Sequence, residues 1–194
     1  MAIKSVHLDI VSDQTTEAFI ACLKRFFSRR GKSQIIFSDN GKNFVSANSE
    51  LKRLILIVTK HDDCLSNFRS EEGIQWKFLP PRVPNFSGLW EAGVKSFKFH
   101  FKRVVGVSKS KLTYEEFYTI LHQIEGILNS RPLTLLSSDM NDLEVLTRGH
   151  FLIGRPITAI AEPNFTNVEN NRLNLWQKTS KMIQVIWKSS KTII

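Results

Sequence analysis

The sequence predicts an α/β layer fold with a basic surface. Strand patterns alternate with amphipathic helical patterns over the first two thirds of the chain, and hydrophobic residues make up 42% of its 194 residues. The third observation is a formal net charge of +9, which favours a polyanionic partner. We therefore expect nucleic acid as the partner, in preference to an acidic membrane surface.

The first part of the chain alternates strands and helices. Residues Ile3 to Val11 alternate apolar and polar side chains, which predicts a strand. The helix that follows has Asp13, Thr15 or Thr16 as its N-cap and ends at Gly31 after two arginines. The next predicted elements are a short buried strand at 33–37, a helix at 47–58 and a strand at 73–80.

The later part begins with two strong helical patterns, at 89–106 and 113–130. The second helix carries an apolar face formed by Phe117, Leu121, Ile124 and Leu128. After Pro132 the pattern weakens, and we expect residues 142–157 to be mixed and loop-like. A basic amphipathic helix follows at 174–191, with a solvated basic face of Lys178, Lys181, Lys188 and Lys191.

Charged residues of the helix at 89–106 repeat at helical spacing. Glu91, Lys95, Lys98 and Lys102 stand at i, i+4, i+7 and i+11, which places them on one stripe. One interpretation is an ion pair between Glu91 and Lys95 on a solvated face. The other is a metal-binding acid at the helix start, followed by lysines that track a phosphate backbone. The neighbouring apolar stripe consists of Trp90, Val94, Phe97, Phe101 and Val104.

Asp39 also has two interpretations. It opens an Asp-Asn-Gly sequence, which is a common turn. It also follows an apolar strand, and ligands of α/β sheets gather at the carboxyl ends of strands. Together, Asp39, Glu91 and the basic charge favour metal-assisted chemistry on phosphodiesters.

The composition indicates which metal such a site would take. Carboxylates suit hard Mg²⁺, and the sequence offers no cluster of His and Cys for a softer metal. His150 is expected to be packed or hydrogen-bonded rather than a ligand. Cys22 lies on an apolar helical face and is expected to be a buried free thiol, while Cys64 is separate from it in sequence.

Several segments resemble a known family. Two long ones resemble the core of retroelement integrases: VHLDIVSDQTTEAFIACLKRFFSRRGKSQIIFSDNGKNFVSAN and WKFLPPRVPNFSGLWEAGVKSFKFHFKRVVG. Two shorter ones, LHQIEGILNSRPLT and LTRGHFLIGRPI, resemble more narrowly the integrases of BEL/Pao-type retrotransposons. The basic segment NLWQKTSKMIQVIWKSS is similar to the one that follows the core in that group.

The resemblance implies a ribonuclease-H-like fold. Residues 1–135 would form a partial integrase catalytic core, and residues 136–194 a small basic segment that is mostly helical or irregular. Asp39 matches the second acid and Glu91 the third acid of an Asp-Asp-Glu triad, so both are expected to be catalytic and to bind Mg²⁺ or Mn²⁺. Asn85, Ser87 and Gly88 fall in the loop before the catalytic Glu. The residues expected to contact DNA are Lys95, Lys98, Lys102, Asn85 and Ser87.

The chain departs from the family at its first acid. The family's first two strands, with the first Asp, have no counterpart in this sequence. Asp9 occupies a different family position and is expected to face solvent beside His7. We therefore expect an N-terminally truncated core with little or no strand-transfer activity, and an unpaired sheet edge that invites association.

The resemblance also implies partners and a location. They are DNA, as element ends and as target, a homo-oligomer in the complete protein and an intracellular, nuclear site of action, with no membrane. The alternative is a non-catalytic DNA-binding remnant or a protein co-opted by its host, which would keep the lysines and not need the acids. Salt-dependent DNA binding that survives loss of Asp39 and Glu91 would favour that alternative.

Overall fold

The computed structural model describes residues 3–59, 73–80, 88–105, 112–135 and 144–191, and it mixes helices with two small sheets. This composition is compatible with the predicted α/β class. The chain divides into two compact units, which we describe separately: unit 1 comprises Met1–Leu8 and Leu89–Ile194, and unit 2 comprises Asp9–Gly88. The predicted boundary between residues 135 and 136 stays a prediction.

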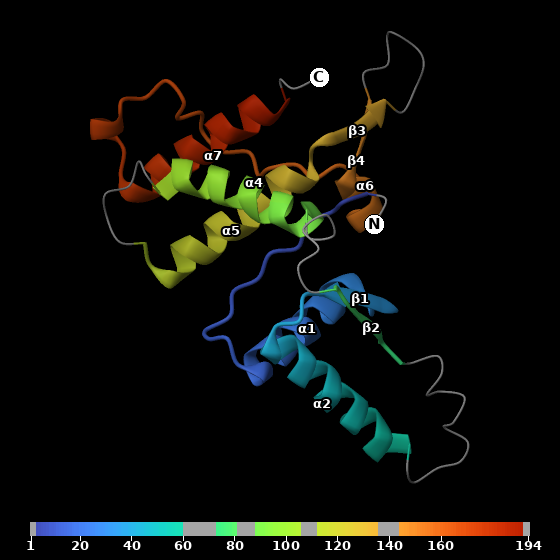
Figure 1. Cartoon of the computed structure of the whole chain (residues 1–194). Helices are drawn as coiled ribbons and strands as arrows, with labels where there is room; N and C mark the ends of the chain where they lie inside the picture. Colours follow the sequence, from blue (N-terminus) through green and yellow to red (C-terminus); the bar gives the residue numbers. More distant parts are fainter. Residues whose placement is uncertain (1–2, 60–72, 81–87, 106–111, 136–143, 192–194) are drawn as a thin grey trace. The chain divides into compact units, whose positions relative to one another are not determined.

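In the described part of unit 2, two helices accompany a parallel pair of strands (Figure 1). The helix α1 (Thr16–Arg30) has Thr15 as its N-cap, whose hydroxyl accepts the Ala18 N–H, and it ends at Gly31 with φ of 81°. Both ends agree with the prediction. The strand β1 (Ile35–Ser38) pairs in parallel with β2 (Gln75–Phe78), and α2 (Lys42–Thr59) follows β1.

Aromatic side chains join the strands of unit 2 to its helices. The ring of Phe19 in α1 lies 4.8 Å from that of Phe44 in α2 and 5.9 Å from that of Trp76 in β2. Trp76 stacks on Phe78 at 6.0 Å, and its indole N–H donates to the Ser38 hydroxyl at 2.8 Å. This cluster supports the sheet from one face.

The other face of the unit 2 sheet is exposed. Ile35 and Phe37 in β1 are 45% and 42% exposed. The alternate residues of the strand, Ile36 and Ser38, point inward. The prediction of a buried strand is therefore wrong for half of its side chains. Its apolar run predicts burial on both faces, but within unit 2 only one face is covered.

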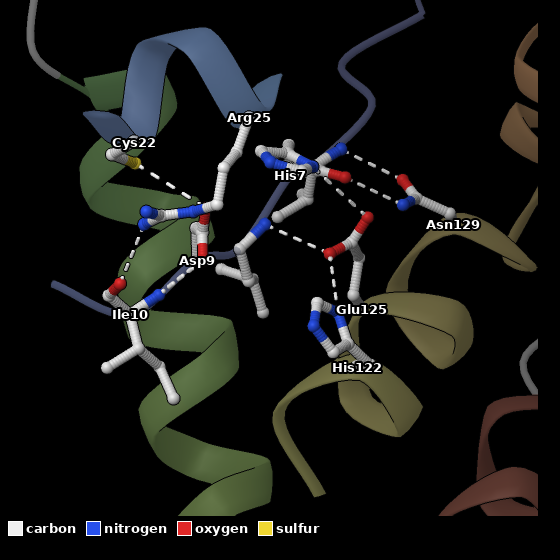
Figure 2. A network of polar contacts seen from close by, with 10 residues as sticks. His7, Asp9, Ile10, Cys22, Arg25, His122, Glu125 and Asn129 are labelled. Carbon is white, nitrogen blue, oxygen red and sulfur yellow. Dashed lines mark hydrogen bonds and ion pairs between the residues drawn. The ribbon is translucent and has the colours of Figure 1, made fainter. Parts of the chain in front are cut away.

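The predicted strand at 3–11 is an extended segment without a neighbouring strand among the described residues. Side chains of α5 (Tyr114–Asn129) hold its unit 1 part instead (Figure 2). Asn129 accepts the Val6 N–H at 2.8 Å and donates to the Val6 carbonyl at 2.7 Å, and Glu125 accepts the Leu8 N–H at 3.0 Å. Two strand residues span about 6.7 Å and one i, i+4 helical step about 6 Å, so helix and segment match in spacing.

Unit 1 is built on α4 (Gly88–Val105), α5 and α7 (Leu175–Lys191). Thr113 and Glu116 form a capping box at the start of α5, which confirms the predicted helix. Six buried aliphatic side chains from α5 and α7 form the core, and Phe97 and Phe101 of α4 pack against it. The core residues are Ile120, Ile124, Ile127, Leu128, Ile183 and Ile186.

The segment predicted to be loop-like contains regular structure. β3 (Pro132–Leu135) pairs antiparallel with β4 (Val145–Thr147), and the short helix α6 (Arg148–Ile153) follows. The Nδ1 of His150 accepts the Thr147 N–H at 3.0 Å, so this histidine caps its own helix, as a hydrogen-bonded role predicts. Elements of three to six residues are too short for the sequence periodicity to show.

The predicted basic helix near the end of the chain is α7, and it follows a short 3₁₀ turn, η3 (Asn170–Arg172). One part of its predicted solvated basic face is wrong. The ammonium group of Lys181 donates to the Val168 carbonyl at 2.6 Å and to the Asn170 side chain at 3.0 Å. This lysine therefore ties α7 to the preceding segment.

Candidate functional site

Asp39 lies in the turn that joins β1 to α2. Its Oδ1 accepts the Gly41 N–H at 2.8 Å, and the Asn40 side chain donates to the Leu79 carbonyl at 2.7 Å. The turn is thereby fixed at the carboxyl ends of both parallel strands. A Cβ at Gly41 would lie 3.0 Å from that Oδ1 and 2.9 Å from the Asn43 side-chain oxygen, so a larger residue there would force these side chains to move.

The structure confirms the turn interpretation of Asp39, and its role as a metal ligand stays a prediction. The Asp-Asn-Gly sequence does turn the chain, as the hydrogen bond to Gly41 shows. The carboxylate is nevertheless exposed at the end of a strand, and no ion pair engages it within the described part of the chain. One of its oxygens accepts the hydrogen bond that fixes the turn.

The predicted charged stripe of α4 is fully exposed. Glu91 lies in the first turn of the helix, and Lys95, Lys98 and Lys102 follow on the same exposed face. No ion pair joins Glu91 to Lys95 in the described residues, although they are one turn apart. The surface ion-pair interpretation is therefore not the arrangement that this helix adopts.

The opposite face of α4 is buried, with one correction to the predicted stripe. Phe97 and Phe101 pack on the core as expected, and their rings stack at 5.4 Å. Val94, however, is 47% exposed, and His100 is buried in the position that the sequence left unassigned. The buried face thus follows positions 97, 100 and 101, at spacings of three and four residues.

An aromatic side chain stands within the basic face and was not predicted as functional. Phe99 is 53% exposed, and the guanidinium carbon of Arg103 lies 4.2 Å from its ring centroid. Phe99 stands at i+4 from Lys95 and at i−3 from Lys102, so a helical projection of the sequence would have found it. The same projection adds Arg103 to the basic residues of the face.

The two candidate metal ligands belong to different units. Asp39 is part of unit 2 and Glu91 of unit 1, so each is described within its own unit. Both are exposed carboxylates, the donor type that Mg²⁺ prefers. Within the described ranges, no group of three or more His, Cys, Asp or Glu side chains could hold a metal ion. Asn85 and Ser87 lie outside the described residues, and Gly88 is the first residue of α4.

Asp9 does not face solvent, contrary to expectation. Its side chain is 4% exposed, and its carboxylate accepts the Arg25 Nε–H at 2.7 Å, with the Cys22 thiol at 3.7 Å (Figure 2). Burial alone would raise the pKa of Asp9, but the hydrogen bond and the charge of Arg25 outweigh it and lower that pKa. A carboxylate neutralised in this way is a poor substitute for a missing metal ligand.

Cys22 is a free thiol, as expected, although it is half-buried rather than fully buried. Burial is the largest cause that raises its pKa, and the negative charge of Asp9 adds to it. A raised pKa keeps the sulfur protonated and unreactive at neutral pH. The thiol therefore serves packing and hydrogen bonding rather than chemistry.

His100 and Arg131 form a buried contact between α4 and the residues after α5. The Nη2 of Arg131 lies 2.9 Å from the Nε2 of His100, which is 4% exposed. Burial first, and the charges of Arg131 and Arg103 next, lower the pKa of His100. The imidazole is therefore neutral, and its Nε2 accepts from the guanidinium.

Unit 1 also has an open, largely apolar groove of about 910 Å³. It lies between α5, α7 and the extended segment 157–166, and it is lined by residues such as Tyr118, Ile183 and Trp187. None of the candidate residues lines this groove. The exposed face of α4 and the groove are therefore separate features.

Comparison with known proteins gives no independent identification: no protein-family model matches the chain, and no curated protein does. Among the described residues, no helix is both long and apolar enough to cross a membrane.

Proposed function

We propose that this protein is a DNA-binding integrase core of the BEL/Pao type, with a ribonuclease-H-like fold. The observation that carries the proposal is the exposed stripe of α4, on which one carboxylate is followed by three lysines without an internal ion pair between Glu91 and Lys95. The resemblance of several segments, in the family's order, supports it. The net charge of +9 agrees with a polyanionic partner.

The lysines are placed to neutralise phosphates. Lys95 and Lys102 are seven residues apart, about 10 Å along the helix axis, with Lys98 between them. Unpaired lysines can exchange their counterions for phosphate contacts, and this exchange supplies most of the sequence-independent affinity for DNA. The protein would act on DNA in the nucleus, and in this family it would work as a homo-oligomer.

The acids correspond to residues that supply the chemistry of the family, and we expect that chemistry to be weak or absent here because the family's first Asp has no counterpart in this sequence. Asp39 and Glu91 would bind Mg²⁺ or Mn²⁺ through their exposed carboxylates. When bound, such metal ions activate the attacking oxygen and stabilise the leaving oxygen in phosphodiester cleavage and transfer. The Gly41 N–H holds one oxygen of the Asp39 carboxylate, and Glu91 lies in the first turn of α4.

A paired substitution tests the DNA-binding part of the proposal. Lys95→Gln with Lys98→Gln removes two cations from the α4 face, and Lys24→Gln with Lys52→Gln removes two exposed cations from unit 2 as a matched control. For duplex DNA, the slope of log K against log salt should fall by about 1.8 in the first variant. Equal slopes in both variants would show that α4 makes no phosphate contact.

A non-catalytic DNA-binding function is the second candidate. The observation that favours it is the neutralisation of Asp9 by Arg25, which removes an acid that could complete a triad. Under this alternative, Asp39→Asn and Glu91→Gln leave DNA affinity unchanged, and the wild-type chain shows no Mg²⁺- or Mn²⁺-dependent nicking. Robust nicking that Asp39→Asn abolishes would establish the catalytic function instead.

A further inference from the structure

Phe99 is an exposed aromatic ring inside a field of positive charge. Its residue is 53% exposed, while Phe97 and Phe101 on either side of it pack against the core. Lys95 and Lys102 flank it one helical turn away on the same face. An exposed phenylalanine needs no explanation by itself, but here the basic surroundings point to a particular class of ligand.

Arg103 prepares the ring for stacking. Its guanidinium carbon lies 4.2 Å from the ring centroid, within the range of a cation–π contact. This contact holds the ring over the helix surface and leaves more than half of the residue exposed. A planar group that stacked on the ring would lie between cations that neutralise the phosphates attached to it.

We propose that Phe99, backed by Arg103, stacks on an unpaired nucleobase of single-stranded or frayed DNA that α4 binds. The inference rests on the proposed function, since it assigns a base contact within the same phosphate-binding face. Base stacking on aromatic side chains is the usual device of proteins that bind single strands. Duplex DNA keeps its base faces stacked inside, so Phe99 would discriminate between the two forms.

The chemistry of the face favours DNA over a second copy of this chain. Another copy would bring the same excess of positive charge, whereas a DNA strand brings one negative charge per nucleotide. If Phe99 had a purely structural role, its contact with Arg103 would only stabilise α4. The experiment distinguishes these outcomes.

The test measures fluorescence anisotropy of a labelled single-stranded oligonucleotide and of the matching duplex. Phe99→Leu keeps the apolar character but removes the aromatic face, and Phe99→Tyr restores it. We expect Phe99→Leu to weaken single-strand binding by about 5- to 100-fold with an unchanged salt slope, and duplex binding by less than about twofold. Phe99→Tyr should bind the single strand like the wild type, and Val94→Ala provides the matched control for an exposed apolar residue of the same helix.

The failures are distinguishable. If Phe99→Leu binds single strands like the wild type while Lys95→Gln with Lys98→Gln weakens binding, the stacking role is wrong and the proposed function stands. If the wild-type chain binds neither form of DNA, the proposed function itself fails. If Phe99→Leu changes the oligomeric state in sedimentation or lowers only thermal stability, the face serves a second copy or the helix, and the stacking role is overturned.

Discussion

The two units of the chain bury their apolar residues in different ways. Unit 1 has six aliphatic side chains in one buried cluster, which come from the two helices α5 and α7. Five of these side chains are at most 2% exposed. Unit 2 buries only Leu23 and Ala47 among its described apolar residues, and it relies on contacts between aromatic rings. The same chain thus combines a region with its own core and a region with an open sheet face.

This difference affects the candidate residues of each unit separately. The α4 face is supported from behind by Phe97 and Phe101, which pack on the core of unit 1. The Asp39 turn is fixed mainly by hydrogen bonds, to Gly41 within the turn and from Asn40 to Leu79. Parallel sheets are normally covered on both faces, so the exposed Ile35 and Phe37 mark unit 2 as the less completely buried scaffold.

The largest expected effect comes from the core of unit 1. Ile124 is fully buried within the aliphatic cluster, so Ile124→Ala should lower the free energy of unfolding by about 2–5 kcal/mol. Ile35→Ala removes the same atoms from an exposed strand position and should change it by about 0.5 kcal/mol or less. Urea unfolding followed by far-ultraviolet circular dichroism measures both.

If Ile124→Ala and Ile35→Ala lower the free energy of unfolding by the same amount, the contrast between the two units is wrong. An equal cost would mean that the exposed face of the unit 2 sheet is covered in solution. Hydrogen exchange of the β1 amides in the Ile35→Ala variant would then locate the added protection.

The next effect tests how α5 holds the N-terminal segment. Asn129 is buried and makes two hydrogen bonds to Val6, so Asn129→Ala should cost about 1–3 kcal/mol by leaving the Val6 backbone unsatisfied. In hydrogen exchange, the Val6 amide should lose more protection than the Leu8 amide, because Glu125 still accepts a hydrogen bond from the Leu8 N–H. Asn171→Ala, at an exposed position in η3, should leave both amides unchanged.

The sequence predicts the helices of this chain well because their signals are local. Periodicity and caps identify α1, with Thr15 at its start and Gly31 at its end, and the capping box at Thr113 marks α5. The predicted strand at 3–11 fails because a strand requires a partner, and the sequence of one segment does not contain it. Two of its backbone donors bind Asn129 and Glu125 instead, each more than a hundred residues away.

The candidate residues, too, could be predicted from the sequence only where the signal is local. The stripe from Glu91 to Lys102 follows from helical spacing, and the structure places it on an exposed face. The burial of Asp9 could not be predicted, since its partner Arg25 lies on the following helix and alternation alone assigns Asp9 to a solvent face. Whether Asp39 and Glu91 act together is a property of two units, and neither local pattern contains it.

A smaller effect concerns how the stability of unit 1 depends on pH. Burial lowers the pKa of His100, so the folded state binds this proton less readily than the unfolded state. Stability is therefore complete above the unfolded pKa of about 6.5 and falls as the pH drops below it. His100→Gln can still accept from Arg131 but does not titrate, so its stability should depend less on pH between about 6.5 and 5.

Comparing His100→Gln with the wild type removes the contribution of the other histidines. His7 and His122 both lie 3.6 Å from the Glu125 carboxylate, and both are present in the wild type and in the variant alike. Parallel curves of stability against pH would mean that the pKa of His100 is the same in the folded and the unfolded state, so that burial does not lower it.

The smallest effect concerns the thiol of unit 2. Burial and the charge of Asp9 raise the pKa of Cys22, so at pH 8 the thiol should react with iodoacetamide several-fold more slowly than in urea. The measurement uses a Cys64→Ser background, so that mass spectrometry follows one site. Asp9→Asn removes the neighbouring charge but not the burial, and it should restore only part of the lost rate. Full restoration would show that unit 2 opens readily around α1, so that this helix packs less firmly than the contact between Asp9 and Arg25 indicates.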